Sequence, residues 1–249
     1  GDRMDLGIKN KVALVTAASQ GLGKASAIEL ANEGVKLAIC SRDQDKINQT
    51  AEEIQNLSGV EVLAVKADLD STDDIENLVK EIEKKFNTVD ILVNNTGGPK
   101  AGFFDDLSDE DWLKTFESTF LSAVRVTRKV LPFMKKNKWG RIINISSVSA
   151  KQPIDNLMLS NGVRMSIHGW AKTLSNQVAS ENILINNVCP GFTHTERVDA
   201  LIKTQVENSN SSREEIIESI ASDIPAKRVG QANELAALVV FLSSEKASY

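Results

Sequence analysis

Short apolar runs alternate along the whole chain with segments of helical periodicity, and this alternation limits the fold more than any other feature. Runs that are apolar at successive positions are typical of strands buried on both faces of a parallel sheet. They lie at residues 12–15, 37–40, 60–65, 91–93, 141–145 and 183–188. Repeated strand–helix–strand units form right-handed crossovers. The sequence therefore predicts one α/β domain of the doubly wound Rossmann type, with a parallel sheet flanked by helices on both faces.

The segments between these runs carry apolar residues at helical spacing. One of them has Ile75, Leu78, Val79, Ile82 and Phe86 on one face. We also expect a helix directly after the first strand, at 25–32, and longer helices at 112–136 and 160–179. A polar stretch at 206–215 is either a mobile lid over a site or a plain loop, and a substrate lid is predicted at about 195–225.

Bulk properties exclude several classes of protein. The chain has 249 residues and a formal net charge of −5, which disfavours a nucleic-acid surface. No apolar run is long enough for a membrane span, and no metal site is predicted. Cys40 and Cys189 are interpreted as buried, reduced thiols of a cytoplasmic protein. Gly1–Arg3, before Met4, are interpreted as a tag remnant, so the domain is expected over residues 4–249.

A turn of small residues follows the first strand and precedes a helix. In this context backbone N–H groups and the helix dipole favour an anion, and glycines let a pyrophosphate approach the backbone. The alternative is a glycine turn that merely connects a strand to a helix. The predicted cofactor contacts of this turn are Thr16, Ala18, Ser19, Gln20, Gly21, Leu22 and Gly23.

Several motifs, in the right order, resemble those of the short-chain dehydrogenase/reductase family. The turn at 16–23 is similar to the family's Thr-Gly-x-x-x-Gly-x-Gly, except that Ala17 replaces the first glycine; Ala17 can serve there if its φ is negative. Residues 94–97 resemble its Asn-Asn-Ala-Gly, and residues 141–147 its fifth strand, which ends on the active-site serine, Ser147. The resemblance further implies cofactor contacts from Asp68, Leu69, Asn95, Thr96, Gly97, Pro190, Gly191, Thr193 and Thr195.

The end of the second predicted strand indicates which dinucleotide is bound. A carboxylate there would bind ribose hydroxyls and repel a 2′-phosphate. This chain has Ser41 and Arg42 instead, which can hydrogen-bond and pair with a phosphate. The sequence thus favours NADP(H), with NAD(H) as the alternative, and Arg42 could also be an exposed arginine without a ligand.

The resemblance breaks at the catalytic residues. The family uses a tyrosine to move the proton, a lysine one helical turn later, a serine that orients the substrate oxygen, and an asparagine that supports a relay water. Here the tyrosine and lysine positions fall on Ser160 and Arg164, and the asparagine position on Thr119. The chain's one tyrosine is Tyr249. Arg164 can bond ribose hydroxyls, but it cannot shuttle a proton.

Another group must therefore transfer the proton, or no proton is transferred at this site. His194, in the loop that the resemblance places beside the nicotinamide, is the first substitute, and a surface histidine is the alternative reading. His168 is interpreted as a packed or partly exposed helix residue. Lys100, Lys151 and Asp155 either line the substrate mouth or are solvated loop charges.

The leading hypothesis is an NADP(H)-dependent oxidoreductase for a carbonyl or alcohol substrate, with Ser147, Ser160 and Arg164 in an atypical site. The alternatives are a dinucleotide-binding sensor or scaffold without redox activity, and a non-redox enzyme of the same fold. The resemblance also implies a homo-oligomer, a dimer or tetramer, built through the helices at 112–136 and 160–179. The family's usual final strand and glycine-rich segment do not follow residues 243–249, which weakens the expectation of a tetramer.

Overall fold

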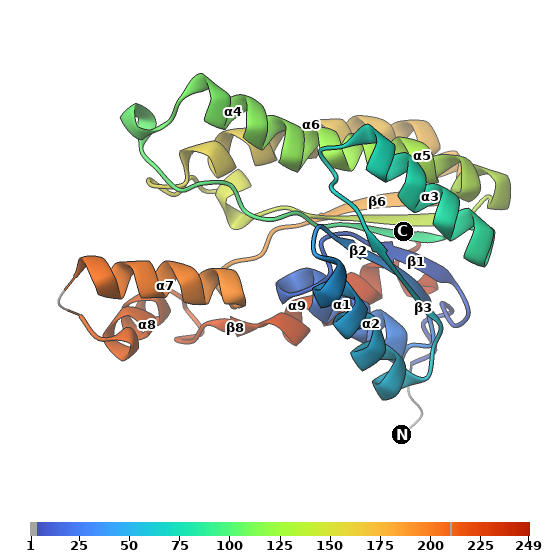
Figure 1. Cartoon of the computed structure of the whole chain (residues 1–249), viewed down its shortest axis with the longest axis horizontal. Helices are drawn as coiled ribbons and strands as arrows, with labels where there is room; N and C mark the ends of the chain where they lie inside the picture. The colour runs from blue at the N-terminus through green and yellow to red at the C-terminus, as the bar shows by residue number, and fades with distance from the viewer. Residues whose placement is uncertain (1–3, 210) are drawn as a thin grey trace.

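Residues 4–209 and 211–249 are described by the computed structural model, and within them six parallel strands form the central sheet in the order β3-β2-β1-β4-β5-β6 (Figure 1). This order confirms the doubly wound prediction and places the reversal of strand order between β1 and β4, where such sheets bind ligands. The strands are β1 (Val12–Val15), β2 (Lys36–Ser41), β3 (Val62–Lys66), β4 (Ile91–Asn94), β5 (Gly140–Ile145) and β6 (Ile183–Val188).

Helices cover both faces of the sheet and divide the apolar core into two clusters (Figure 1). One face is covered by α1 (Gly21–Asn32), α2 (Gln44–Ser58) and α9 (Ala232–Leu242). The other face is covered by α3 (Thr72–Phe86), α5 (Ser122–Asn137) and α6 (Met158–Val178). The inner strands β1, β4 and β5 are buried throughout. The expectation of full burial is wrong for β3 and β6, which are partly exposed because they form the two edges.

The helix expected at 112–136 is interrupted. It consists of α4 (Asp109–Thr115), a π-helical turn η2 (Phe116–Leu121) and then α5. Ser108 begins α4 with a capping box to Asp111. A π-helical turn adds a residue to the helical repeat and is frequent at functional sites. Short 3₁₀ turns lie elsewhere in the described residues: η1 (Phe104–Asp106), η3 (Val148–Ala150), η4 (Ala179–Glu181) and η5 (Glu245–Ala247).

A small group of elements stands beside the main body. It contains α7 (Glu196–Asn208) and α8 (Arg213–Ser222), and β7 (Thr193–His194) pairs with β8 (Gly230–Gln231) at its base (Figure 1). The expectation of an irregular stretch at 206–215 is therefore largely wrong. α7 continues to Asn208, and Ser212 begins α8 with a capping box to Glu215; Asn210 lies outside the described residues.

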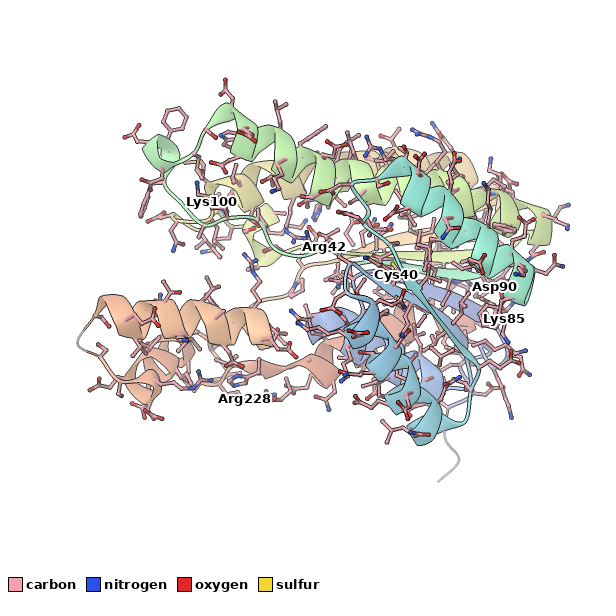
Figure 2. All side chains as sticks on the ribbon, viewed as in Figure 1. Cys40, Arg42, Lys85, Asp90, Lys100 and Arg228 are labelled. Carbon is pink, nitrogen blue, oxygen red and sulfur yellow. The ribbon has the colours of Figure 1, made fainter. Side chains whose placement is uncertain are left out.

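The two cysteines have different environments. Cys40 lies inside β2 and is fully buried, as expected (Figure 2). Cys189 is only half-buried, because it follows the last residue of β6 at the sheet edge, so the prediction of a buried thiol is wrong there. In the described part of the chain, no helix is long and apolar enough to cross a membrane. Gly1–Arg3, read as a remnant, fall outside the described ranges.

Candidate active site

The turn after β1 is held by the loop after β4. The Thr16 hydroxyl donates to the carbonyl of Asn95 at 2.7 Å and accepts from the Asn95 backbone N–H at 2.8 Å. The Asn95 side-chain amide donates to the carbonyl of Ala17 at 3.1 Å. Ala17 has a φ of 46°, so the condition of a negative φ is not met. The chain turns here in the left-handed conformation that favours glycine, and the side chain of Asn95 supports it.

The amino terminus of α1 has no side-chain cap, and the Glu196 carboxylate lies near its first residue, Gly21. Gln20 precedes the helix in an extended conformation without a side-chain cap, and the first turn carries no acidic residue. A Cβ on Gly23 would lie 2.6 Å from both the Ala17 carbonyl oxygen and the Asn95 side-chain nitrogen. Only glycine therefore fits at this position. The N–H groups of the first turn are suited to a phosphate. The contacts expected from residues 18–22 stay a prediction, and the Ala18 N–H already donates to the Cys40 carbonyl at 3.0 Å.

The two residues predicted to select the dinucleotide differ in their availability. The Ser41 hydroxyl is buried and already donates to the carbonyl of Asp43 at 2.9 Å. Arg42 is exposed at the end of β2, and its guanidinium makes no hydrogen bond or ion pair with another described residue (Figure 2). Arg42 is thus the available charge for a phosphate, whereas Ser41 shapes the turn.

The loops after β3 and β4 lie at the same edge of the sheet. Asp68 and Leu69 follow β3, and the Asp68 backbone N–H donates to the Asp74 carboxylate at 2.8 Å. Thr96 and Gly97 follow β4, directly after Asn95, whose side chain supports the turn at Ala17. Because carboxyl ends of parallel strands share one edge, Thr96 and Gly97 border the switch point, whereas Asp68 and Leu69 lie at the same edge of the sheet beyond β2. Their contacts with a cofactor stay a prediction.

A chain of three serines follows β5. The Ser147 hydroxyl accepts from the Ser149 backbone N–H at 3.1 Å, and the Ser149 hydroxyl lies 3.0 Å from the Ser160 hydroxyl. Ser149 and Ser160 are buried, and Ser147 is half-buried. The structure therefore brings the predicted pair Ser147 and Ser160 together through Ser149, which the sequence analysis missed. Of the three, Ser147 has the most exposed side chain.

Arg164 lies one helical turn beyond Ser160 on α6 and is buried. Its Nη1 donates to the carbonyl oxygens of Ile145 and Ser146, both at 3.1 Å. Burial lowers the pKa of Arg164 to about 10, and the positive charge of Arg197 contributes. No hydrogen bond of its Nε or Nη2 is made within the described residues, so part of its guanidinium remains available beside the serines.

His168 is tied to the same strand end, a contact that the sequence analysis missed. Its Nε2 lies 3.0 Å from the Ser146 hydroxyl and 3.8 Å from the Cys189 sulfur. Burial, followed by the positive charge of Lys151, lowers the pKa of His168. The spacing of 164 and 168 on one helix could have signalled that both face β5. The reading of His168 as a packed helix residue is in keeping with this geometry.

The remaining candidates make no hydrogen bond to the serine chain within the described residues. Thr119 is buried in the π-helical turn η2, and His194 is half-buried in β7. Within the described residues, neither side chain makes a hydrogen bond. Lys100 forms an ion pair with Asp111 at 3.0 Å, so its charge is directed to α4. Lys151 is exposed, and its positive charge contributes to the lowered pKa of His168.

The loop after β6 closes the site on one side. The Pro190 carbonyl accepts from the Val148 backbone N–H at 2.9 Å, and the Thr193 hydroxyl donates to the Gly191 carbonyl at 3.2 Å. Thr195 caps α7 by accepting from the Val198 N–H.

An open pocket of about 650 Å³ also lies beside α6. It is lined by Phe103, Trp112, Pro153, Asp155, Met158, Asn161 and Gly162.

Residues 11–206 match the family described as short chain dehydrogenase. The chain belongs to this family. The matched residues include the turn after β1 (16–23), called the phosphate turn below, together with the serine chain and the loop after β6. This short-chain dehydrogenase is an oxidoreductase.

Curated relatives and solved structures resemble this short-chain dehydrogenase over nearly their full length. The NADPH-dependent reductase BacG of Bacillus subtilis (strain 168) is 34% identical over 243 residues, covering 97% of this chain and 94% of that protein. A 3-oxoacyl-[acyl-carrier-protein] reductase FabG of Staphylococcus epidermidis is 32% identical, covering 96% and 94%. The structure of L-sorbose reductase from Gluconobacter frateurii, complexed with NADPH and L-sorbose, superposes with a TM-score of 0.95 at 32% identity, covering 99% and 94%.

Proposed function

We propose that this chain is an NADPH-dependent reductase of carbonyl compounds whose site uses Ser147, Ser160 and Arg164 where the family has serine, tyrosine and lysine. The observation that carries the proposal is the buried guanidinium of Arg164 beside the linked serines, at the carboxyl end of β5. Relatives named as NADPH-dependent reductases support the reaction class.

The residues present fit a dinucleotide. The open amino terminus of α1 would hold the diphosphate, because Gly23 lets it approach and no side chain caps the helix. The exposed Arg42 would pair with the 2′-phosphate through its planar fork. The preference for NADPH over NADH therefore rests on Arg42. When bound, the reduced nicotinamide supplies the hydride that a carbonyl carbon accepts.

The chain's own groups would act on the carbonyl oxygen. The half-buried Ser147 hydroxyl would donate a hydrogen bond to that oxygen, and the Ser149 N–H holds the Ser147 oxygen in place. The Arg164 charge would stabilise the negative charge that develops on the oxygen, in a site where burial strengthens the interaction. Neither serine is a strong acid, so we assign the final proton to a solvent molecule that enters beside Ser147.

Binding and turnover with NADPH test this proposal. We expect NADPH to bind and to be oxidised with at least one member of a carbonyl panel, as followed by the absorbance of the reduced nicotinamide. Arg42→Ala should weaken NADPH binding by about 10- to 100-fold and leave NADH binding almost unchanged. An equal loss for both dinucleotides would contradict the role of Arg42.

Two further variants test the serine and arginine roles. Ser147→Ala should lower the turnover number by about 100-fold, as expected for the loss of a donor to a developing oxyanion. Unchanged rates would remove Ser147 from the mechanism. Ser160→Tyr combined with Arg164→Lys restores the family's pair; if this double variant gains activity that the parent lacks, the parent site is not a working reductase.

The alternative is a dinucleotide-binding protein without redox activity. It is motivated by the absence of a tyrosine at position 160 beside a well-formed phosphate turn. NADPH binding without oxidation by any carbonyl compound would favour this alternative over the reductase.

We also propose that the chain forms a homodimer through α4, η2 and α6. Large apolar side chains are exposed on these elements: Leu113 is 71% exposed, Met165 54% and Phe116 39%. Phe120 packs between Phe116 and the edge of Trp170, which extends the apolar surface. Apolar faces of this kind mark interfaces, and the resemblance to the family supports a second copy at this face.

Sedimentation analysis tests the dimer. Met165→Asp should shift the protein to a monomer, because a carboxylate would be buried without a partner. Leu238→Asp, on α9, is the matched control, since Leu238 is 45% exposed on another face. The same assembly state for wild type and Met165→Asp would contradict the interface.

A further inference from the structure

Arg197 connects the α7 segment to the loop after β4. Its Nη2 donates to the Pro99 carbonyl at 3.0 Å. The guanidinium lies against Gly98 so closely that a Cβ on Gly98 would be 1.8 Å from the Arg197 Cζ. Glycine at 98 therefore creates the space for this side chain. One face of Arg197 remains exposed to solvent.

Arg197 and Arg164 form a pair of cations without an acidic partner. Neither guanidinium makes an ion pair with a carboxylate of the described residues. They are close enough for the charge of Arg197 to add to the lowering of the pKa of Arg164 that burial causes. Two unneutralised cations repel each other, and an anion between them would remove that repulsion.

The position of this pair separates it from the predicted diphosphate site. Thr195 and Glu196, the residues before Arg197, lie against Gly21 at the amino terminus of α1. Arg197 instead reaches Gly98 and Pro99 beyond β4, and Arg164 is fixed to the carbonyl groups that end β5. Ser147 follows the same strand. The pair thus lies on the side of the site where the carbonyl oxygen would be held.

We propose that Arg197 and Arg164 bind an anionic group of the substrate, so that this reductase acts on carbonyl compounds that carry a carboxylate. The inference rests on the proposed reductase function. Arg197 keeps Nε and Nη1 uncommitted among the described residues, which leaves N–H groups for a planar carboxylate.

The test compares 2-oxo acids with their methyl esters, which keep the carbonyl and lose the charge. Wild-type protein with NADPH should reduce the acids with a kcat/KM about 10- to 100-fold above that of the esters. Arg197→Ala should abolish this preference by raising KM for the acids, and Arg197→Lys should retain part of it. Lys203→Ala, which removes an exposed charge from the same helix, is the matched control and should keep the preference.

Binding measurements separate this inference from the proposed function. Calorimetric titration of 2-oxobutanoate into the NADP⁺-loaded protein should show binding that Arg197→Ala weakens, even if no carbonyl compound is reduced. Equal use of acids and esters, or no binding of the acid, would overturn the proposal. Weaker NADPH binding in Arg197→Ala, with the acid preference retained, would assign Arg197 to the cofactor diphosphate and equally overturn it.

Discussion

The side-chain amide of Asn95 donates to the backbone carbonyl of Ala17 at 3.1 Å, across 78 positions of sequence. The two residues belong to loops on either side of the point where the strand order reverses. Ala17 has a φ of 46°, which costs an L-residue about 1–2 kcal/mol. The bond from Asn95 helps to hold Ala17 in this conformation, so the phosphate turn depends on its neighbouring loop.

Replacing Ala17 with glycine should stabilise the protein. The left-handed conformation costs glycine almost nothing, and the larger entropy of glycine in the unfolded chain offsets part of the gain. We expect the free energy of unfolding to rise by about 0.5–1 kcal/mol in denaturant titrations. Ala18→Gly, at a buried position without a positive φ, should be destabilising. A less stable Ala17→Gly variant would show that the turn is not strained.

Buried amides connect three strands. The Asn94 side chain donates to the Asn144 side-chain oxygen at 2.9 Å, and Asn144 donates to Asn187 at 2.8 Å. Asn144→Leu would leave the buried Asn94 with Thr127 as its remaining partner. We expect a loss of about 1–3 kcal/mol in the free energy of unfolding, measured by denaturant titration. Asn187→Leu should cost less, because Asn187 is half-buried and water can replace the bond. Equal losses would contradict this explanation.

The protein should lose stability in mild acid through His168. Burial lowers the pKa of His168 in the folded state below its ordinary value of 6.5, so the folded state binds fewer protons than the unfolded chain. Its contribution is present above pH 6.5 and is lost as the pH falls from there through the lowered folded-state pKa. His168→Gln should flatten this part of the pH dependence in thermal unfolding. The same pH dependence in wild type and in His168→Gln would contradict this role of His168.

The two thiols should react at different rates with a thiol reagent. Burial raises the pKa of Cys40 to about 12, so its reactive thiolate is almost absent at neutral pH. Cys189 is half-buried and should be labelled in the folded protein, whereas Cys40 should be labelled after unfolding. Mass spectrometry of peptides from labelled protein identifies the modified residue. Labelling of Cys40 at the rate of Cys189 under native conditions would disagree with its burial.

The sheet could be predicted because its signals are local. Short apolar runs and capped, periodic helices such as 72–86 depend on neighbouring residues alone. The strand–turn–helix context likewise located the phosphate turn. The positive φ of Ala17 could not be predicted, since a side chain from a distant loop supports it. The contact of Ser149 with Ser160 and the hydrogen bond from Arg197 to Pro99 could not be predicted either. Each joins two segments that no sequence pattern connects.

The line of amides from Asn94 through Asn144 to Asn187 has a consequence for how the strands align during folding. β4 and β5 are apolar on both faces, so sliding one past the other would still bury apolar side chains. A slip by one residue would turn Asn144 to the opposite face and leave its neighbours' polar groups unpaired in the core. The amides thus penalise misaligned pairings that hydrophobicity alone would tolerate, and in the native alignment they bring Ser147 and Asn95 to the same edge.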